Sequence, residues 1–517
     1  MARVPATSVP MGDSHLQDGA VEGGQPLAIN PTNDLFRVRP SEKLVGEIAM
    51  SALSCGVDIG STNVKVTLVD EFGHAVWTKA VPTPRLPDDG GIATDALGLV
   101  AVIEEMIVSG WRMHGSSLPL RAIAAAGVGE DGVGVRADLT PTGLALPWFD
   151  QRAATQANHL QRASSYAAQA GLAIDYSRTA AKWLWLRQNR PADLLSSAFW
   201  VALTDYPAVV WTGRPFMSET LAARTACYDV YARRWIEPLL AAAGAPTLPP
   251  VVPAGTVLGN VQKGPLWESG AASAATIVAA GGHDHPIAAA AIRRLHANAL
   301  VDSMGTANLV YGETTEMAEP RLDPYLAFSV PSIGDAGLSC LGVFELGAAI
   351  QPLRRPTDVV QRLLASERIP GIPRDRPIPI PGSTELLVPS GDEPTEVDVR
   401  AVLEAASFYA RRMFEEILAA GAKPAPIFAT GGWARSHAFV ELRASIFGQP
   451  VIVVDEPELT AIGAALIAAQ GATGVASPFG KELNLRKIEP VAAWTEPYAK
   501  LYQDFRTRLD ATKEQQG

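Results

Sequence analysis

Alternation of apolar and polar residues predicts a small antiparallel sheet beginning at Cys55. An apolar run over residues 55–59 meets a bend of small polar residues, and alternation resumes over residues 64–69. A second turn at residues 70–73 predicts a third strand that ends near Ala80. The pattern therefore predicts a β-hairpin with a third antiparallel strand beside it.

The next periodic segment has the spacing of an amphipathic helix. Residues 94–111 predict this helix, and the apolar residues 123–128 predict a buried strand after it. The apolar face of the helix is expected to contain Ala96, Leu97, Val100, Ile103 and Ile107.

A similar order of elements recurs later in the chain. Strands are predicted within residues 299–310, a helix at 397–418, a strand at 426–429 and a buried, small-residue helix at 458–469. A β-β-β-α-β-α order is that of the actin-like ATPase fold. We therefore expect an α/β protein of two actin-like (ribonuclease H-like) domains, residues 51–295 and 296–510, with a central cleft.

Residues 1–50 lack a sustained apolar period and mix Pro, Gly, Asp and Asn. This composition predicts a disordered N-terminal extension. An alternative is that translation starts at Met50, immediately before the first predicted strand.

Composition narrows the classes of function. A chain of 517 residues exceeds one core, which agrees with two domains. The formal net charge of −11 argues against nucleic-acid binding. No apolar run reaches the ~20 residues of a membrane span, and there is no secretion signal. The three cysteines are far apart and predict reduced thiols, so we expect a cytoplasmic protein.

The bend of the first hairpin has the composition of a phosphate site. Gly60 tolerates unusual backbone dihedrals, and Ser61 and Thr62 offer hydroxyls and accessible amides. Asp58, at the end of the first strand, is suited to holding Mg²⁺ against phosphate. The alternative is an ordinary structural hairpin.

Four segments, in order, resemble the FGGY carbohydrate kinases, which are sugar and polyol kinases of the actin-like ATPase superfamily. The first is the Asp58 hairpin, and the other three lie downstream. They are Gly129-Glu130-Asp131-Gly132 with the segment 147–152, Gly281-Gly282-His283-Asp284-His285 with Ser303-Met304-Gly305-Thr306, and Thr430-Gly431-Gly432 with the segments 447–451 and 458–465.

The resemblance implies an acceptor site around the second segment. The matching positions are Asp131, Trp148 and Asp150, with Glu130 and Arg152 nearby. Carboxylates can accept two hydrogen bonds from neighbouring hydroxyls, and an indole covers the apolar face of a sugar. Trp148 could instead be a packed loop aromatic, and Asp150 and Arg152 could form an internal salt bridge.

Asp284 is the candidate general base and also a candidate contact to the substrate. It follows an apolar strand and two glycines, and the residues after it predict a helix whose positive end faces the site. The alternative is that Asp284 is a helix N-cap. His283 and His285 flank it, but alternate residues on a tight turn usually diverge, so a zinc site is not expected.

The nucleotide side is expected to bind ATP through three loops. The residues implied by the resemblance are Ser61, Thr62, Asn63, Lys65, Gly305, Thr306, Gly431, Gly432 and Ser436. A Gly-Gly pair after a strand is by itself weak evidence, because such pairs are common at strand-to-helix turns.

Three departures from the family pattern concern the substrate and the cleft. Gly129-Glu130-Asp131 replaces the usual Gln-Met-His or Gln-Arg-Glu, Trp433 replaces a third glycine, and the region 389–397 is short. The first departure puts the identity of the acceptor in doubt.

Together these features imply ATP-dependent phosphorylation of a hydroxyl on a small ketose, such as a pentulose or hexulose, or on a polyol. Asp284 would be the base, and Mg²⁺ would be held by Asp58. The alternatives are a catalytically silent sugar-binding member and an actin-like ATPase without an acceptor. We expect a small-molecule substrate and no nucleic-acid or membrane partner, and a homodimer is left open.

Overall fold

The computed structural model describes most of the chain after the predicted extension. The residues it describes are 52–114, 117–162, 166–305, 307–334, 336–344, 346, 359–369, 395–476, 479 and 483–514. Residues 1–50 and most of the short region 389–397 lie outside them.

The first sheet contains the predicted hairpin. Its strand order is β13-β14-β6-β1-β2-β3, and β15 also pairs with β6. β1 pairs antiparallel with β2 so that Ile59 lies opposite Val64, and β2 continues antiparallel to β3, which confirms the predicted three strands. The strands are β1 (Ser54–Ile59), β2 (Asn63–Val69), β3 (Ala75–Pro82), β6 (Ala122–Gly127), β13 (Val257–Asn260), β14 (Ile277–Ala279) and β15 (Gly282–His283).

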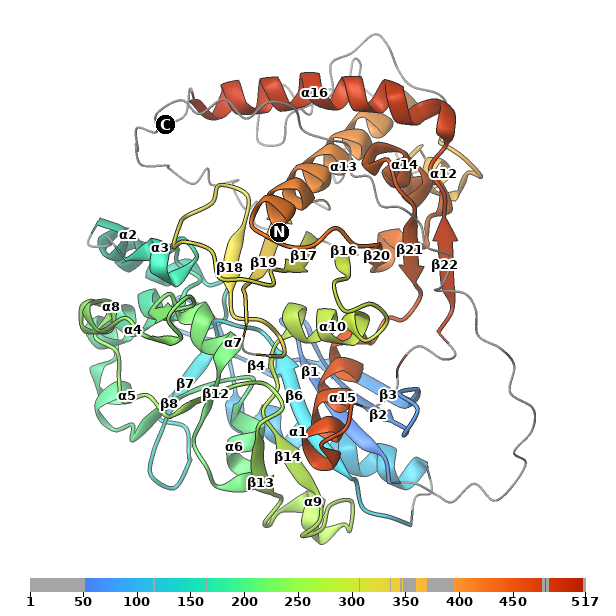
Figure 1. Ribbon diagram of the computed structural model, residues 1–517. Helices are drawn as coiled ribbons and strands as arrows, with labels where there is room; N and C mark the ends of the chain where they lie inside the picture. Colours follow the sequence, from blue (N-terminus) through green and yellow to red (C-terminus); the bar gives the residue numbers. More distant parts are fainter. Residues whose placement is uncertain are drawn as a thin grey trace.

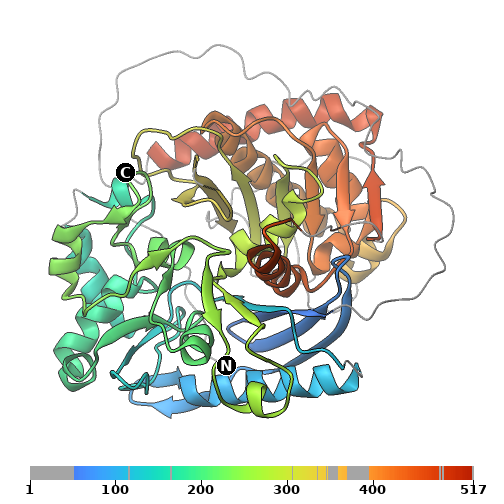
Figure 2. The same ribbon diagram turned by 60° about the horizontal axis from the view of Figure 1, so that its bottom comes forward.

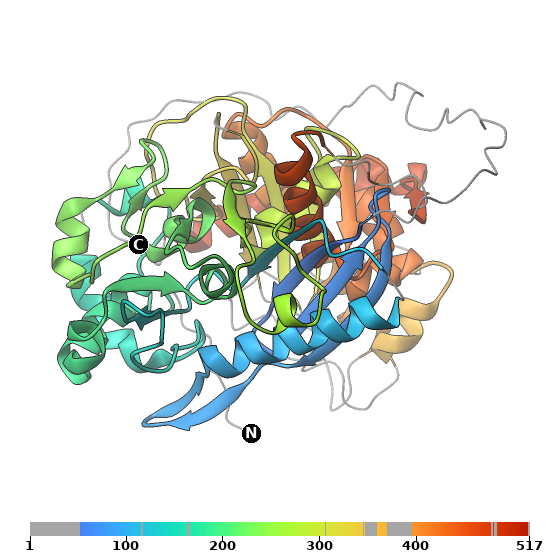
Figure 3. The same cartoon turned by 90° about the horizontal axis from the view of Figure 1, so that it is seen from below.

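Helix α1 (Ala96–Met113) packs on β2 and β3 and lies across the strands in Figure 3. Its N-terminus is capped by Asp95, whose side chain accepts a hydrogen bond from the Leu97 amide. Ala96, Val100, Ile103 and Ile107 are buried as predicted, whereas Leu97 is 55% exposed. The prediction for Leu97 was wrong because a residue in the first turn lies at the edge of the buried stripe.

The second sheet repeats the mixed pattern in the order β18-β19-β17-β16-β20-β21-β22. Helices α13, α14 and α16 lie on one side of it in Figure 1. The strands are β16 (Leu300–Met304), β17 (Asn308–Glu313), β18 (Ala327–Ser329), β19 (Ser339–Phe344), β20 (Ile427–Thr430), β21 (Val451–Val454) and β22 (Leu485–Ile488). The helices of this half are α12 (Val359–Ala365), α13 (Glu396–Ala419), α14 (His437–Phe447) and α16 (Ala492–Glu514).

The predicted small-residue helix is α15 (Leu459–Thr473), and it is buried along most of its length. Although it belongs to the C-terminal part of the chain, it packs against β1, β6 and α10 (Asp284–Arg293). Figure 2 shows it end-on between the two sheets. The contact with β1 is direct, because a Cβ at Gly56 would lie 1.7 Å from the Ala461 carbonyl oxygen.

A lobe of short elements extends from the first sheet, on the left in Figure 1. Its β7–β8 pair follows β6 and leads into helices that surround buried aromatic residues such as Trp183. The short elements of this part of the chain are β4 (Arg85–Asp88), β5 (Gly91–Thr94), β7 (Gly132–Val135), η2 (Gln151–Ala153), α2 (Ala154–Arg162), α3 (Ala167–Ala170), α4 (Thr179–Asn189), α5 (Pro191–Leu195), β8 (Phe199–Ala202), α6 (Tyr206–Thr212), β9 (Met217–Ser218), α7 (Glu219–Ala222), η3 (Ala223–Thr225), β10 (Tyr228–Asp229), β11 (Arg234–Trp235), α8 (Glu237–Ala243), β12 (Val251–Val252) and α9 (Pro265–Glu268). Of these, α9 lies outside the lobe and packs on α1.

A fully buried polar network connects helix α14 to the neighbouring strands β16 and β17. The Arg443 guanidinium pairs with Asp302, and its Nη2 donates to Asn308 Oδ1 at 2.6 Å. Asn308 Nδ2 in turn donates to Asp302 Oδ1 at 2.8 Å. The network therefore fixes the ends of β16 and β17, between which residues 305–307 lie.

Replacing Arg443 by Met should lower the free energy of unfolding by about 3–5 kcal/mol, because a buried carboxylate loses its partner. Urea denaturation followed by circular dichroism measures this loss. Lys500→Met is a matched control, since Lys500 pairs with Glu496 on the surface of α16, and it should change stability by less than about 1 kcal/mol. Equal effects of the two substitutions would contradict a structural role of the network.

Candidate functional site

The site is built where three parallel strand ends meet. β6 pairs parallel with β1 and with β15, so Asp58 and Gly282 both lie beside Ala126. The carboxyl ends of parallel strands share one edge of a sheet, which is the usual place for ligands in such folds. The segments that follow β6 and β15 carry Glu130, Asp131 and Asp284 to this edge.

Glycine allows the loop before Asp284 to approach β6. A Cβ at Gly281 would lie 1.8 Å from the Ala125 carbonyl oxygen, so a larger residue would push the loop out of the sheet. The His283 amide donates to the Thr220 hydroxyl at 2.9 Å, which fixes the loop to α7. Asp284 then begins α10, with its carboxylate at the positive end of the helix.

Two histidines surround the Asp284 carboxylate. Its Oδ1 accepts a hydrogen bond from the His285 amide at 2.7 Å, and His283 Nε2 lies 3.1 Å from the same oxygen. His285 Nε2 lies 3.7 Å from it. The expected divergence of these side chains was wrong: strand β15 ends at His283 and α10 begins at Asp284, so the chain bends and the two rings meet edge to face.

Asp58 is an acid in an unfavourable environment. Burial raises the pKa of its carboxyl to about 7, and the negative charges of Asp284 and Glu458 act in the same direction against a smaller opposing effect of Lys65. A nearby cation would stabilise the ionised form of such a carboxylate. The electrostatic coupling also places Asp58 and Asp284 in one site.

The bend of residues 60–63 is held on both sides. The Gly60 amide donates to the Asn63 carbonyl at 3.0 Å, and Arg85 Nη2 donates to the Ser61 carbonyl at 2.8 Å. The side chains of Thr62 and Asn63 are exposed. Lys65 Nζ forms an ion pair at 3.0 Å with Glu458, the residue that precedes α15.

Glu130 lies between two arginines. Its Oε1 accepts from Arg178 Nη1 at 2.7 Å and from Arg224 Nε at 2.8 Å. Although burial works against ionisation, the Arg224 and Arg178 guanidinium groups hold the pKa of Glu130 below its ordinary value. Glu130 is therefore a buried anion with protein partners.

Asp131 differs from its neighbour in having an oxygen without a partner. Its Oδ1 lies 3.4 Å from Lys182 Nζ, whereas its buried Oδ2 accepts no hydrogen bond from the described part of the chain. Burial raises the pKa of Asp131 despite the charge of Lys182. A buried acceptor of this kind is stabilised by a donor from a ligand.

The loop of residues 147–152 presents aromatic rings and an internal salt bridge. Trp148 is 40% exposed and packs edge to face against Phe149. Asp150 pairs with Arg152, whose Nη1 also donates to Asp88 Oδ2 at 2.6 Å. Asp150 thus has the internal partner that was the alternative to a sugar contact.

On the second sheet, two loops predicted to bind the nucleotide lie side by side. β16 and β20 are parallel neighbours, and a Cβ at Gly431 would lie 2.5 Å from the Met304 carbonyl oxygen. Gly305 follows Met304, and Gly432 begins the 3₁₀ turn η6 (Gly432–Arg435). Thr306 lies outside the described residues.

Ser436, directly after that turn, caps the N-terminus of α14. Its hydroxyl accepts from the Phe439 amide at the start of α14 and donates to the Leu364 carbonyl at 2.6 Å. These contacts make Ser436 the N-cap of α14.

Sequence reasoning missed the cations of the site. Arg178, Lys182 and Arg224 contact Glu130 or Asp131 from 48 to 94 residues away along the chain. The available signal was weak: Lys182 lies between the apolar residues Ala181 and Trp183 in α4.

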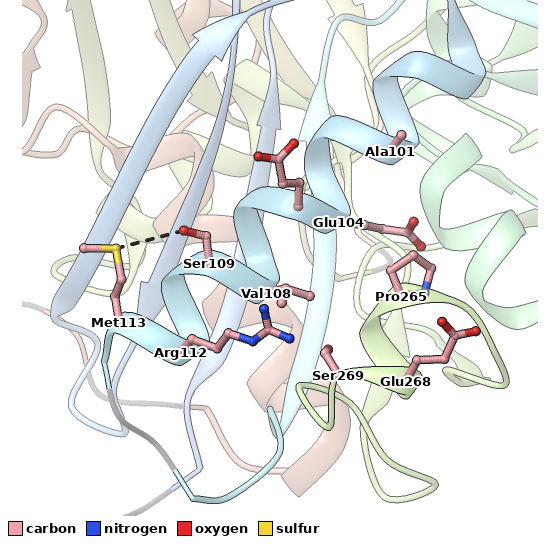
Figure 4. Close-up of a pocket in the computed structure, with 10 residues that line it drawn as sticks. Ala101, Glu104, Val108, Ser109, Arg112, Met113, Pro265, Glu268 and Ser269 are labelled. Carbon is pink, nitrogen blue, oxygen red and sulfur yellow. Dashed lines mark hydrogen bonds between the residues drawn. The ribbon is translucent and has the colours of Figure 1, made fainter.

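A separate open pocket of about 720 Å³ lies between α1 and α9, and Figure 4 shows its lining side chains. Glu104, Glu105, Arg112 and Glu268 are part of this lining. It contains none of the predicted site residues.

None of the helices in the described part of the chain combines the length and apolar character that a membrane span needs.

Two family models match the chain. The N-terminal domain of the FGGY family of carbohydrate kinases matches residues 53–291, and the C-terminal domain of the same family matches residues 364–472. The first range covers the ends of β1, β6 and β15, and the second covers β20 and nearly all of α15.

Relatives of similar length carry kinase names. A xylulose kinase from Streptomyces coelicolor is 28% identical over 82% of this chain and 89% of its own length. A glycerol kinase from Rhodospirillum rubrum is 25% identical over 82% of this chain and 90% of its own length.

Solved structures agree on the fold. The structure of xylulose kinase from Rhodospirillum rubrum aligns with a TM-score of 0.77 and 19% identity, covering 90% of this chain and 99% of that one. That of Plasmodium falciparum glycerol kinase with ADP aligns with a TM-score of 0.74 and 14% identity, covering 89% and 98%. The predicted family and fold are thereby confirmed: the chain belongs to the FGGY family of carbohydrate kinases and has their two-sheet, actin-like fold.

Proposed function

We propose that this kinase transfers the γ-phosphoryl group of ATP to one hydroxyl of a small ketose or polyol, with Asp284 as general base. The observation that carries the proposal is the shared edge of β1, β6 and β15, where Asp58 lies near the end of β1, Asp284 follows β15 and Asp131 lies in the segment that follows β6. Phosphoryl transfer needs a base near the acceptor, a cation on the phosphates and donors for their oxygens. Residues of each type lie at this edge.

Asp131 would receive the acceptor. Its Oδ2, to which no group in the described part of the chain donates, would accept a hydrogen bond from an acceptor hydroxyl, and Lys182 keeps its other oxygen in place. Trp148, which is partly exposed, would cover the carbon face of the acceptor. Glu130 orients Arg178 and Arg224 around this position, and Asp150 shapes the Trp148 loop through Arg152.

Asp284 would accept the proton on Oδ2. Its Oδ1 already accepts the His285 amide hydrogen, which fixes the orientation of the carboxylate. The N-terminus of α10 favours negative charge, so it stabilises the anionic base and the transferring phosphoryl group.

Asp58 would hold Mg²⁺. Its carboxylate suits a hard cation, and a cation would stabilise the ionised form that burial, and to a smaller extent the charge of Asp284, disfavours. When bound, Mg²⁺ neutralises charge on the phosphates. Lys65 would exchange its partner Glu458 for phosphate oxygens, beside the amides of the 60–63 bend.

The second sheet would bind the rest of the nucleotide. Gly305 and Gly431–Gly432 leave space beside adjacent strand ends, where larger side chains would exclude ribose and purine. We propose that the predicted domains, residues 51–295 and 296–510, close on the substrates and exclude water, which would otherwise hydrolyse ATP.

The names of the relatives support the substrate class. Xylulose kinase, glycerol kinase and L-fuculokinase are among them, and the first two are the most similar of these. A ketose or a polyol is therefore the acceptor to test first, by thermal-shift screening with a non-hydrolysable ATP analogue.

Asp284→Asn should lower kcat by about 10²–10⁴-fold, because the amide keeps the shape of the carboxylate but cannot accept the proton. Calorimetry should show that the acceptor and the ATP analogue still bind. Turnover close to that of the unmodified chain would refute the assignment of the base.

Asp131→Ala should raise the acceptor KM by the equivalent of about 1–3 kcal/mol and leave the ATP KM near its starting value, since one buried hydrogen bond to the acceptor is lost. Asp138→Ala, in the exposed loop after β7, is the matched control. Parallel increases in both KM values would indicate misfolding, and no change would place the acceptor elsewhere.

Asp58→Asn should melt at a higher temperature than the unmodified chain at pH 8 without Mg²⁺, although it should lose activity. The pKa of Asp58 is about 7 in the folded chain, above the ~3.9 of an unfolded Asp. The folded state therefore binds more protons between these values, and stability falls as pH rises through this window. Melting scans from pH 4 to 8 should show that the difference in melting temperature between the variant and the unmodified chain grows with pH. A difference that stays constant would contradict a raised pKa of Asp58.

A further inference from the structure

The side chains of His283, Asp284 and His285 form a compact set of metal-ligand atoms. One such atom from each residue lies within 4.8 Å of the other two. His283 Nε2 is 3.1 Å and His285 Nε2 is 3.7 Å from Asp284 Oδ1. These contacts belong to consecutive residues at the junction of β15 and α10, so the backbone holds all three together.

The spacing suits a transition metal. Ligands about 2.0–2.1 Å from a tetrahedral ion lie roughly 3.3 Å from one another. The two histidine-to-Asp284 separations bracket this value, and the two histidine nitrogens lie within 4.8 Å of each other, so side-chain rotations can bring the three atoms around one ion. His283 is anchored through its amide to Thr220, while the His285 side chain is 43% exposed and leaves a path from solvent.

The charges around the triplet favour a cation. His283 is buried and its Nε2 lies beside the Asp284 carboxylate. The Arg178 and Arg224 guanidinium groups, whose charges also reach His283, are paired with Glu130. Asp58 is a second carboxylate close enough for the charge of Asp284 to raise its pKa.

We propose that His283, Asp284 and His285 bind a transition-metal dication, of which Zn²⁺ and Co²⁺ are examples, and that the bound ion inhibits the kinase by occupying the base. Imidazole nitrogen favours these ions, whereas Mg²⁺ prefers oxygen ligands. The site is therefore distinct in chemistry from the magnesium site at Asp58. Metal binding stands independently of the proposed function, but its inhibitory effect rests on it.

Binding is tested by titrating Co²⁺ into the full chain without Mg²⁺, using calorimetry and visible absorption. One ion should bind per chain, and His285→Ala should weaken binding by at least about tenfold. His159→Ala, on the exposed side of α2, is the matched control and should bind as the unmodified chain does. Absence of a cobalt site, or equal affinity of His285→Ala, would overturn the proposal. Because His285 is partly exposed, its replacement should leave the melting temperature unchanged, which separates metal loss from misfolding.

Inhibition is tested by adding Zn²⁺ to the kinase reaction at saturating Mg²⁺. Excess acceptor should relieve the inhibition, and His285→Ala should need at least about tenfold more Zn²⁺ than His159→Ala does. Relief by ATP instead of acceptor would place the inhibitory ion at the nucleotide and overturn the inhibitory role. If no acceptor is phosphorylated at all, the proposed function fails while the cobalt titration still decides the metal site.

Discussion

The site depends on backbones that touch without side chains between them. At Gly281 a Cβ would reach the Ala125 carbonyl, and at Gly56 it would reach Ala461 of α15. These contacts allow the loop before Asp284 to join the edge of β6 and allow α15 to lie directly on β1. As a result, β1, β6 and β15 end at one level, with Asp58 near the end of β1 and Asp284 directly after β15. A larger residue at either glycine would push these backbones apart and so move the carboxylates at the strand ends away from one another.

Bringing several carboxylates to one sheet edge has an electrostatic cost, and the structure offsets it unevenly. Glu130 and Asp131 are paired with Arg178, Arg224 and Lys182 from the neighbouring lobe. The pKa of Asp58 is raised, first by burial and then by the charge of Asp284, against an opposing effect of Lys65. An added cation beside Asp58 would stabilise its ionised form.

Local patterns predicted the regular elements well and individual contacts less well. The β1–β2 hairpin, α13 and the buried α15 follow from periodicity, because each buries one face or its whole surface. The misplaced Leu97 lies in a first helical turn, where periodicity cannot locate the edge of the buried stripe. Ser436 has the helix-capping contacts that Ser commonly makes, although the resemblance had suggested the nucleotide. The convergence of His283 and His285 depends on a bend between a strand and a helix, which spacing alone did not reveal.

By itself, the sequence determined the order of the elements, the family and the identity of the acids at the strand ends, because periodicity and short motifs are local properties of the chain. Tertiary structure decided which of these acids are paired. Asp131 keeps a buried oxygen that no group among the described residues pairs with, whereas Glu130, its neighbour, is held by two arginines that follow it by 48 and 94 residues. The strength of a charge pair depends on the distance between the two groups in space. Packing sets that distance, and it cannot be read from the number of residues that separate the two groups along the chain.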